Sequence, residues 1–168
     1  MTAEAKGYSG AIVSLNISAG GVPKLPVEAV AIDFPGIVGD GHNDRKHHGG
    51  PDRAVCIYSR ELIELLRTEG HPVEPGSAGE NITVAGLDWS LMVPGIRLRL
   101  GTVEVEVTAY TSPCKTIGGS FVDRNFMRIS QIKNPGWSRV YATVLVPGYV
   151  KTEDPVVITT GGVAHSLP

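Results

Sequence analysis

The strongest constraint on the fold is the alternation of apolar and charged residues in the stretch IRLRLGTVEVEV, from Ile96 to Val107. An alternation with a period of two predicts a pair of half-buried β-strands, joined here at Gly101 and Thr102. A two-residue turn would make oppositely charged side chains face each other: Arg97 with Glu106, and Arg99 with Glu104. Such pairs stabilise a sheet mildly and fix its register. In that register we expect Leu98 opposite Val105 on the other face, and Leu100 opposite Val103 on the charged face.

Most of the remaining chain also reads as short strands between turns. Runs rich in β-branched or aromatic residues are Ala11–Ile17, Val27–Phe34, Ala54–Tyr58, Tyr141–Val146 and Val156–Thr159. The 21 glycines and 12 prolines are spread along the whole chain, as turns between short strands require. This pattern predicts a mainly β fold, a single closed or nearly closed β-barrel with a few short flanking helices. Its 168 residues suit one domain, residues 1–168.

Helical signal is sparse. Ser59 can cap a helix over residues 60–69, which Gly70 would end. In that helix we expect one apolar face, formed by Leu62, Leu65 and Leu66. A second, weaker candidate helix covers Ser120 to Ile132, where Phe121, Val122, Phe126 and Ile129 have roughly helical spacing.

Charge and hydropathy exclude several classes of protein. The 15 basic and 17 acidic residues give a formal net charge of −2, which argues against non-specific binding to nucleic acid. No apolar stretch is long enough to span a bilayer, and the N-terminus does not resemble a secretory signal. We therefore expect a cytoplasmic protein that does not act on membranes. The two cysteines, Cys56 and Cys114, are too few for a disulfide scaffold.

The first dense polar cluster is GDGHNDRKHHGGPDRAV, from Gly39 to Val55. Gly49 and Gly50 can bring main-chain amides close to a ligand, and Arg53 stands beside them, a combination that suits an oxyanion. A solvated polar loop with one or two structural histidines explains the composition equally well. The three histidines of this cluster, His42, His47 and His48, could also bind zinc, but no cysteine pair or HExxH spacing supports that.

Two later clusters complete the candidate chemistry. The stretch GSAGENITV, from Gly76 to Val84, places Glu80 and Asn81 at a tight turn into a strand, which alone could be plain turn chemistry. In YTSPCKTIGG, Cys114 follows a strand and Lys115 is adjacent, so an exposed thiolate could act as a nucleophile or a soft metal ligand. Cys56 lies in an apolar strand-like run and is expected to be buried. Arg139 in NPGWSR could lie in a plain turn or reach a bound phosphate.

In this order and spacing the clusters resemble the MOSC family, named for the C-terminal domain of molybdenum-cofactor sulfurase. The resemblance runs from SAGGVPKLPV at Ser18–Val27 through HHGGPDRAV, GEN and PCK to PGWSRVYATVLVPG, and it is strongest to short stand-alone bacterial members. It implies a β-barrel like that of pyruvate kinase, with Cys114 as the molybdenum ligand or the sulfur-handling residue. It also implies contact with the molybdenum cofactor (molybdopterin). The residues expected to make that contact, from the resemblance or from the clusters themselves, are His48, Gly49, Gly50, Asp52, Arg53, Glu80, Asn81, Lys115 and Arg139.

This chain departs from the family pattern next to the cysteine. Thr111 stands where many members have arginine, and Thr116 stands where a lysine is common, so cofactor affinity or reaction type could differ. The aminotransferase-like domain of full-length sulfurases has no counterpart here, so we expect no pyridoxal phosphate domain in this chain. Short relatives reduce N-hydroxylated compounds with electrons from partner proteins. The resemblance therefore implies a small-molecule substrate and an external electron-donor protein.

Three functions fit these residues. The first is a molybdenum-cofactor oxidoreductase that reduces N-hydroxylated compounds, with Cys114 as metal ligand and with the chemistry belonging mainly to the cofactor. The second is a sulfur carrier that holds a persulfide on Cys114 and is loaded by a cysteine desulfurase. The third is a non-enzymatic module that binds or delivers the cofactor.

Overall fold

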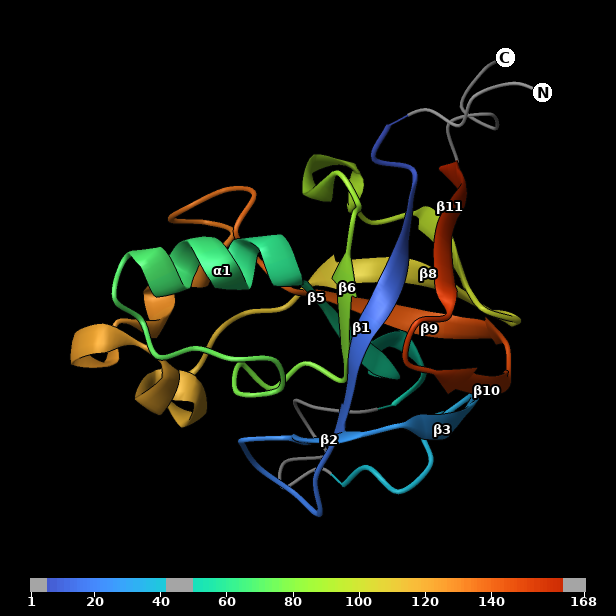
Figure 1. The fold of residues 1–168 in the computed structure, drawn as a ribbon, viewed down its shortest axis with the longest axis horizontal. Coiled ribbons are helices and arrows are strands. Elements are labelled where there is room, and N and C mark those ends of the chain that lie inside the picture. The colour runs from blue at the N-terminus through green and yellow to red at the C-terminus, as the bar shows by residue number, and fades with distance from the viewer. Residues whose placement is uncertain (1–5, 42–49, 162–168) are drawn as a thin grey trace.

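The computed structural model describes residues 6–41 and 50–161 of the chain. In this described part, seven strands close into a barrel in the order β1, β6, β5, β9, β8, β7 and β11, with β11 returning to β1 (Figure 1). Their bounds are β1 Ser9–Ile17, β5 Val55–Ser59, β6 Ile82–Ala85, β7 Ile96–Leu100, β8 Val103–Tyr110, β9 Val140–Val146 and β11 Pro155–Gly161. The predicted barrel is therefore confirmed, and all five predicted strand runs contain strands.

The β7–β8 hairpin has the predicted register. Arg97 pairs with Glu106 and Arg99 with Glu104, and Arg97 Nε donates to Glu106 Oε1 at 2.9 Å. One detail of the prediction is wrong, because Leu100 and Val103 do not lie on the charged face. Both are fully buried, on the same side as Leu98 and Val105, since residues two apart along a strand share a face.

The predicted run from Val27 to Phe34 is divided between two sheets. Strand β2 (Leu25–Val27) pairs with β1, whereas β3 (Ala29–Asp33) joins a second, three-stranded sheet. That sheet also contains β4 (Gly36–Ile37) and β10 (Gly148–Lys151), and it lies below the barrel in Figure 1. The sequence pattern did not predict β10.

Helix α1 (Arg60–Thr68) begins and ends close to the predicted positions. The hydroxyl of Ser59 accepts a hydrogen bond from the Leu62 amide at 3.2 Å, and the helix C-cap is Glu69. The predicted apolar face is wrong in one residue, because Leu65 is 50% exposed while Ile63 and Leu66 are buried. The helix connects β5 to β6, which are parallel neighbours and therefore need a crossover between them.

No α-helix forms between Ser120 and Ile132, so that prediction is wrong. We call residues 111–139 the cysteine segment; it contains the 3₁₀ turns η3 (Lys115–Ser120), η4 (Val122–Arg124) and η5 (Phe126–Ile129). Asp123 and Arg124 have φ of 54° and 55°, a left-handed backbone that interrupts any helix. The apolar spacing instead reflects burial of Phe121 and Ile129 at separate turns. Two further 3₁₀ turns are η1 (Pro51–Arg53) and η2 (Trp89–Leu91).

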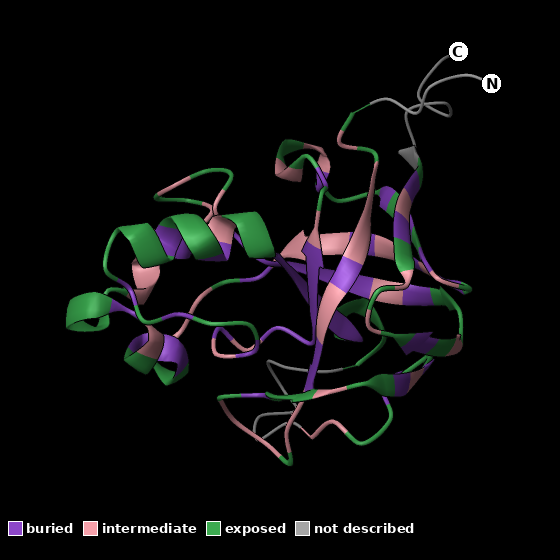
Figure 2. Cartoon of the chain, viewed as in Figure 1, coloured by how far each residue is buried: buried purple, intermediate pink, exposed green. Residues whose placement is uncertain are grey.

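Buried side chains form two clusters. Figure 2 marks the buried residues along the chain. The larger cluster fills the barrel. The smaller lies between α1 and the cysteine segment and includes Tyr58, Ile63, Leu66, Ile117 and Phe121. Alternate residues of β5 face different clusters, because Val55 and Ile57 belong to the first and Tyr58 to the second. None of the helices in the described residues is long and apolar enough to cross a membrane.

Candidate functional site

The two cysteines occupy contrasting environments. Cys114 follows β8 at the start of η3, is partly exposed, and has its Sγ 2.8 Å from the hydroxyl of Thr116. Cys56 is 5% exposed in β5, and its Sγ lies 3.7 Å from the hydroxyl of Thr111. Burial raises the pKa of the Cys56 thiol, which disfavours the reactive thiolate. The prediction that Cys56 is buried is confirmed, and Cys114 is the accessible thiol.

Arg139 joins the turn before Glu80 to the strand end before Cys114. Its side chain is almost fully buried; Nη1 donates to the carbonyl of Ala78 at 2.6 Å and Nη2 to the carbonyl of Ser112 at 3.4 Å. Among the described residues, its Nε has no hydrogen-bond partner. A buried guanidinium that binds only neutral carbonyls retains an uncompensated positive charge, which suits an anion.

Gly79 lies next to this arginine. Its φ is +85°, and a Cβ at this position would lie 3.5 Å from Arg139 Nη1 and 3.8 Å from the Ile117 side chain. Since Ile117 belongs to the turn that follows Cys114, the fold places the GEN turn, Arg139 and the Cys114 turn side by side. Two clusters that are distant in the sequence therefore meet at one place.

Tyr141 extends this site toward the first polar cluster. It pairs with Cys56 across β5 and β9, and the Arg53 guanidinium lies 5.6 Å above its ring. Burial raises the pKa of Tyr141 to about 12. Cys56 and Cys114 also raise this pKa, whereas Arg139 and Arg53 lower it. The phenol therefore keeps its proton at neutral pH. Sequence reasoning missed this residue, because one tyrosine inside an apolar strand gives no functional signal.

The end of the first polar cluster is fixed beside Tyr141. The hydroxyl of Thr108 in β8 donates to the carbonyl of Asp52, and Gly50 has the left-handed φ of 85° that favours glycine. Asp52 and Arg53 are exposed, so their side chains can reach solvent or a ligand. His48 and Gly49, with His42 and His47, lie outside the described residues.

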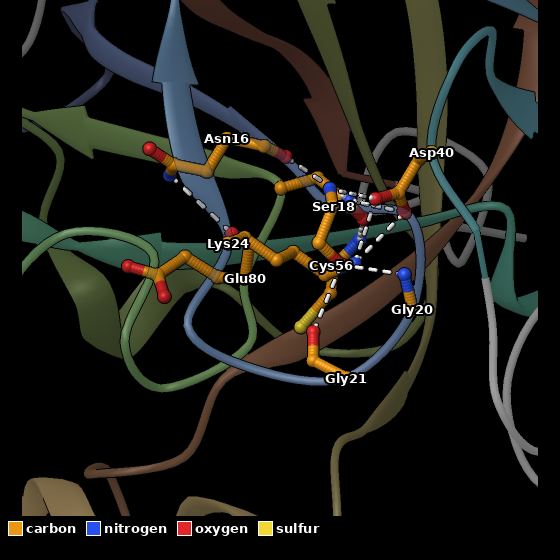
Figure 3. A network of polar contacts seen from close by, with 9 residues as sticks. Asn16, Ser18, Gly20, Gly21, Lys24, Asp40, Cys56 and Glu80 are labelled. Carbon is orange, nitrogen blue, oxygen red and sulfur yellow. Dashed lines mark hydrogen bonds and ion pairs between the residues drawn. The ribbon is translucent and has the colours of Figure 1, made fainter.

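A polar network joins several loops beside Cys56 (Figure 3). Both carboxylate oxygens of Asp40 accept from Lys24 Nζ, at 2.8 and 2.9 Å, and one also accepts from the side-chain amide of Asn81 at 2.9 Å. In turn, Asn81 Oδ1 accepts from the Cys56 amide at 2.9 Å. Asn81 therefore fixes backbone next to the site, a supporting position. No sequence pattern predicted the Lys24–Asp40 pair, which joins separate loops.

Glu80 lies fully buried beside this network. Its Oε2 accepts from the hydroxyl of Thr83 at 3.0 Å, while Oε1 has no hydrogen-bond partner among the described residues. Burial raises the pKa of this carboxyl, against the opposing effects of nearby backbone amides, Thr83 and Arg139. The site therefore contains a buried acid that favours its neutral form.

Of the predicted site residues, Cys114, Arg139, Glu80 and Asn81 surround one region, with Arg53 beside Tyr141. Lys115 is exposed next to Cys114, and its carbonyl accepts a hydrogen bond from Arg124. The arrangement combines an accessible soft donor, a buried cation and a neutral phenol, a set that can hold an anionic group with a thiophilic centre.

The chain is similar in sequence to a known protein family and to individual members of it. The MOSC domain profile matches residues 44–157, which include Arg53, Glu80, Cys114 and Arg139. The uncharacterized protein YflK of Bacillus subtilis is 32% identical over 132 residues, which make up 77% of this chain and 59% of YflK. Protein YiiM of Escherichia coli is 32% identical over 125 residues, 72% of this chain and 55% of YiiM. The chain thus spans less than two thirds of the length of these relatives.

Solved structures agree with the barrel. The crystal structure of YiiM from Geobacillus stearothermophilus superposes with a TM-score of 0.65 and 25% identity, covering 92% of this chain and 77% of that protein. The YuaD protein from Bacillus subtilis gives a TM-score of 0.68 at 19% identity, over 88% of this chain and 94% of that one. Because the family profile covers more than half of the residues, the chain belongs to the MOSC domain family.

Proposed function

We propose that this protein binds the molybdenum cofactor through Cys114 and reduces N-hydroxylated small molecules. The observation that carries the proposal is the position of Cys114, a partly exposed thiol on a turn that reaches Gly79, where the Arg139 guanidinium also lies. Membership of the MOSC family, whose domains are associated with this cofactor, supports the same assignment. The alternative thiol of Cys56 is buried and disfavoured as a thiolate.

The residues at the site fit the cofactor in two respects. A thiolate is a soft ligand of the kind molybdenum takes, and Cys114 is accessible enough to supply one. The pterin carries a phosphate, and the buried guanidinium of Arg139, which donates to two neutral carbonyls, favours a negative charge nearby. Lys115 and Arg53 supply further positive charge at the exposed side. In the proposed site, His48, Gly49, Gly50 and Asp52 complete the anion-binding loop.

The protein's own residues would bind and orient the reactants. When bound, the cofactor supplies two-electron redox chemistry, fed by an external electron-donor protein. Reduction of an N-hydroxyl compound to its amine consumes two electrons and two protons and releases one water. Tyr141 keeps its proton at neutral pH, so it can donate a hydrogen bond to a substrate oxygen. In this proposal Glu80 and Asn81 support the residues that line the site.

The test is the molybdenum and pterin content of protein purified from a host that makes the cofactor. We expect near-stoichiometric molybdenum in the wild type, loss of molybdenum in Cys114→Ser, and retention in the matched control Cys56→Ser. Circular dichroism of each variant checks that the barrel is folded. Equal molybdenum in Cys114→Ser and wild type would remove Cys114 as the ligand. Bound molybdenum without turnover, given a competent reductase, would indicate a cofactor-delivery module.

A sulfur carrier is the second candidate, favoured by the exposure of Cys114. A persulfide must leave one protein and reach another, and only an accessible thiol can do this. Loading with a cysteine desulfurase followed by cyanide treatment measures the transferred sulfur. Cyanide-releasable sulfur on the wild type that is absent from Cys114→Ser would support this function. None on either protein would exclude it.

A further inference from the structure

The cysteine segment contains an unusual pair of backbone conformations. Asp123 and Arg124 both have left-handed φ, 54° and 55°, although neither is a glycine. Such a conformation is costly for a residue with a Cβ and is rare in consecutive residues. Strain of this kind persists where the surrounding structure requires it, and it concentrates near functional sites.

The strained pair directs the Arg124 guanidinium onto the turn that follows Cys114. Arg124 Nη2 donates to the carbonyl of Lys115 at 3.0 Å. Lys115 immediately follows Cys114, so this hydrogen bond fixes the peptide next to the thiol. The side chain is otherwise exposed, and burial therefore does not explain its position.

Gly118 leaves the space that the Arg124 guanidinium occupies. A Cβ at residue 118 would lie 2.6 Å from Arg124 Nη2 and 2.8 Å from its Cζ. These atoms end an exposed, flexible side chain, so a Cβ at residue 118 would displace the guanidinium from this position rather than the backbone. At the neighbouring Gly119 an added Cβ would meet nothing within 4 Å. The chain therefore leaves room for the guanidinium at one glycine and not at the next.

The turn held by Arg124 contains the contacts that orient Cys114. The Ile117 amide donates to the carbonyl of Cys114 at 3.1 Å, and the hydroxyl of Thr116 lies 2.8 Å from its Sγ. Ile117 is 3% exposed and anchors the turn in the smaller core. Arg124 adds a hydrogen bond to this turn from outside it, through the carbonyl of Lys115.

We propose that Arg124 is a positioning residue for Cys114, seated by the left-handed pair and by the clearance over Gly118. The guanidinium holds the Lys115 peptide so that the turn from Cys114 to Gly118 keeps one conformation. The effect of this positioning on activity rests on the proposed function, in which the Cys114 thiol binds the metal. We call the hydrogen bond from Arg124 to the Lys115 carbonyl the clamp. The clamp is a property of the apoprotein and can be measured without the cofactor.

Hydrogen exchange of the Ile117 amide tests the clamp. In Arg124→Ala and in Gly118→Ala we expect exchange about fivefold to tenfold faster than in wild type, the loss expected of one hydrogen bond. Two matched controls should leave it unchanged. Arg67→Ala removes another guanidinium that donates to a backbone carbonyl, that of Val73 at 2.9 Å, and Gly119→Ala adds a methyl group in open space.

The double variant Gly118→Ala/Arg124→Ala should exchange no faster than either single variant, because both act through the same contact. Arg124→Lys, which retains a donor, should recover part of the protection. Iodoacetamide labelling separates a local effect from general unfolding. In Gly118→Ala we expect Cys114 to be alkylated about threefold faster while Cys56 stays unreactive, because loss of the clamp's hydrogen bond opens only the turn.

Unchanged exchange in Arg124→Ala, or equal behaviour of Gly118→Ala and Gly119→Ala, would overturn the proposal. Additive effects in the double variant would also overturn it. If the clamp behaves as expected but wild-type protein retains no molybdenum, the positioning role stands and the cofactor proposal fails. If molybdenum is retained and unaffected by Arg124→Ala despite faster exchange, the clamp does not serve metal binding.

Discussion

The seven barrel strands, here called the barrel wall, and the cysteine segment satisfy their backbone polar groups in different ways. Strands β7 and β8 pair residue by residue along a regular ladder. In the cysteine segment, backbone amides donate to carbonyls of short local turns, and some donate to side chains: Val122 to Nδ1 of His71 at 3.0 Å, and Gly136 to the amide oxygen of Gln131 at 3.1 Å. A ladder distributes a local loss over many bonds, whereas a single side-chain acceptor has no substitute. We therefore expect changes in the barrel wall to alter the global free energy of unfolding, and changes in the cysteine segment to act locally.

The largest expected effect is in the wall. Leu98 is fully buried in the barrel core, so Leu98→Ala leaves a cavity and should lower the free energy of unfolding by about 2–5 kcal/mol. Urea denaturation measures it. The control Leu65→Ala, at an exposed position of α1, should cost less than about 0.5 kcal/mol. Equal losses in the two variants would break the distinction between wall and surface.

The next effect concerns Glu80, where the barrel meets the segment. Its pKa is raised in the folded state, so between the unfolded and folded values the native protein binds more protons than the unfolded chain. The stabilisation is complete below the unfolded value, about 4.3, and is lost as pH rises through the folded value. Glu80→Gln cannot titrate, so its stability relative to wild type should increase with pH.

Urea denaturation at a series of pH values above 4 measures this difference. For one group its slope is at most about 1.4 kcal/mol per pH unit. The control is Glu64→Gln, at an exposed position of α1, which should follow the wild-type curve. Parallel curves for Glu80→Gln and wild type would contradict the assignment of a raised pKa to Glu80.

A smaller effect is expected in the cysteine segment, where the loss of one ion pair should act locally. Arg128 makes a bidentate pair with Glu69, at 2.7 and 2.9 Å, and lies 3.9 Å above the Trp137 ring. Arg128→Ala should cost about 1 kcal/mol, because part of the pair is solvent-exposed. Hydrogen exchange should rise mainly at amides of the cysteine segment. A rise spread evenly over the barrel strands would contradict the separation of the two regions.

The smallest effect should come from the exposed charges of the wall. Arg97 pairs with Glu106 at the surface of the hairpin, and such pairs contribute little in water. Arg97→Gln should change the free energy of unfolding by less than about 0.5 kcal/mol, measured by urea denaturation. A loss comparable to that of Leu98→Ala would mean that the charged face, rather than the core, stabilises the hairpin.

The same division explains what the sequence could predict. The hairpin was predictable because its alternation encodes both faces and the register, and Ser59 marked the start of α1. The helix over residues 120–132 was a wrong prediction, because the left-handed Asp123 and Arg124 carry no sequence signal and the apolar spacing arises from tertiary burial. Strand β10 was missed because it is four residues long and its Tyr149 is 75% exposed.

For the candidate site, local motifs singled out candidate residues but did not predict the contacts around them. Cys114 and Arg139 were identifiable from their neighbours in the chain, and Cys56 was correctly expected to be buried. The contacts of Asp40 with Lys24 and Asn81 join three loops that are separate in the sequence. Pairings of this kind depend on tertiary structure, and one sequence does not contain them in readable form.

The pairing of β1 with β11 has a consequence for the order of events during synthesis. Ser9 pairs with Val157, so the barrel cannot close until nearly all of the described chain has left the ribosome. Until then β1 can pair with β2 and β6, but the edge that will meet β11 stays open to other strands. A nascent chain of this protein therefore passes through a long interval in which its first strand is exposed, and rapid release or chaperone cover in that interval should decide its yield.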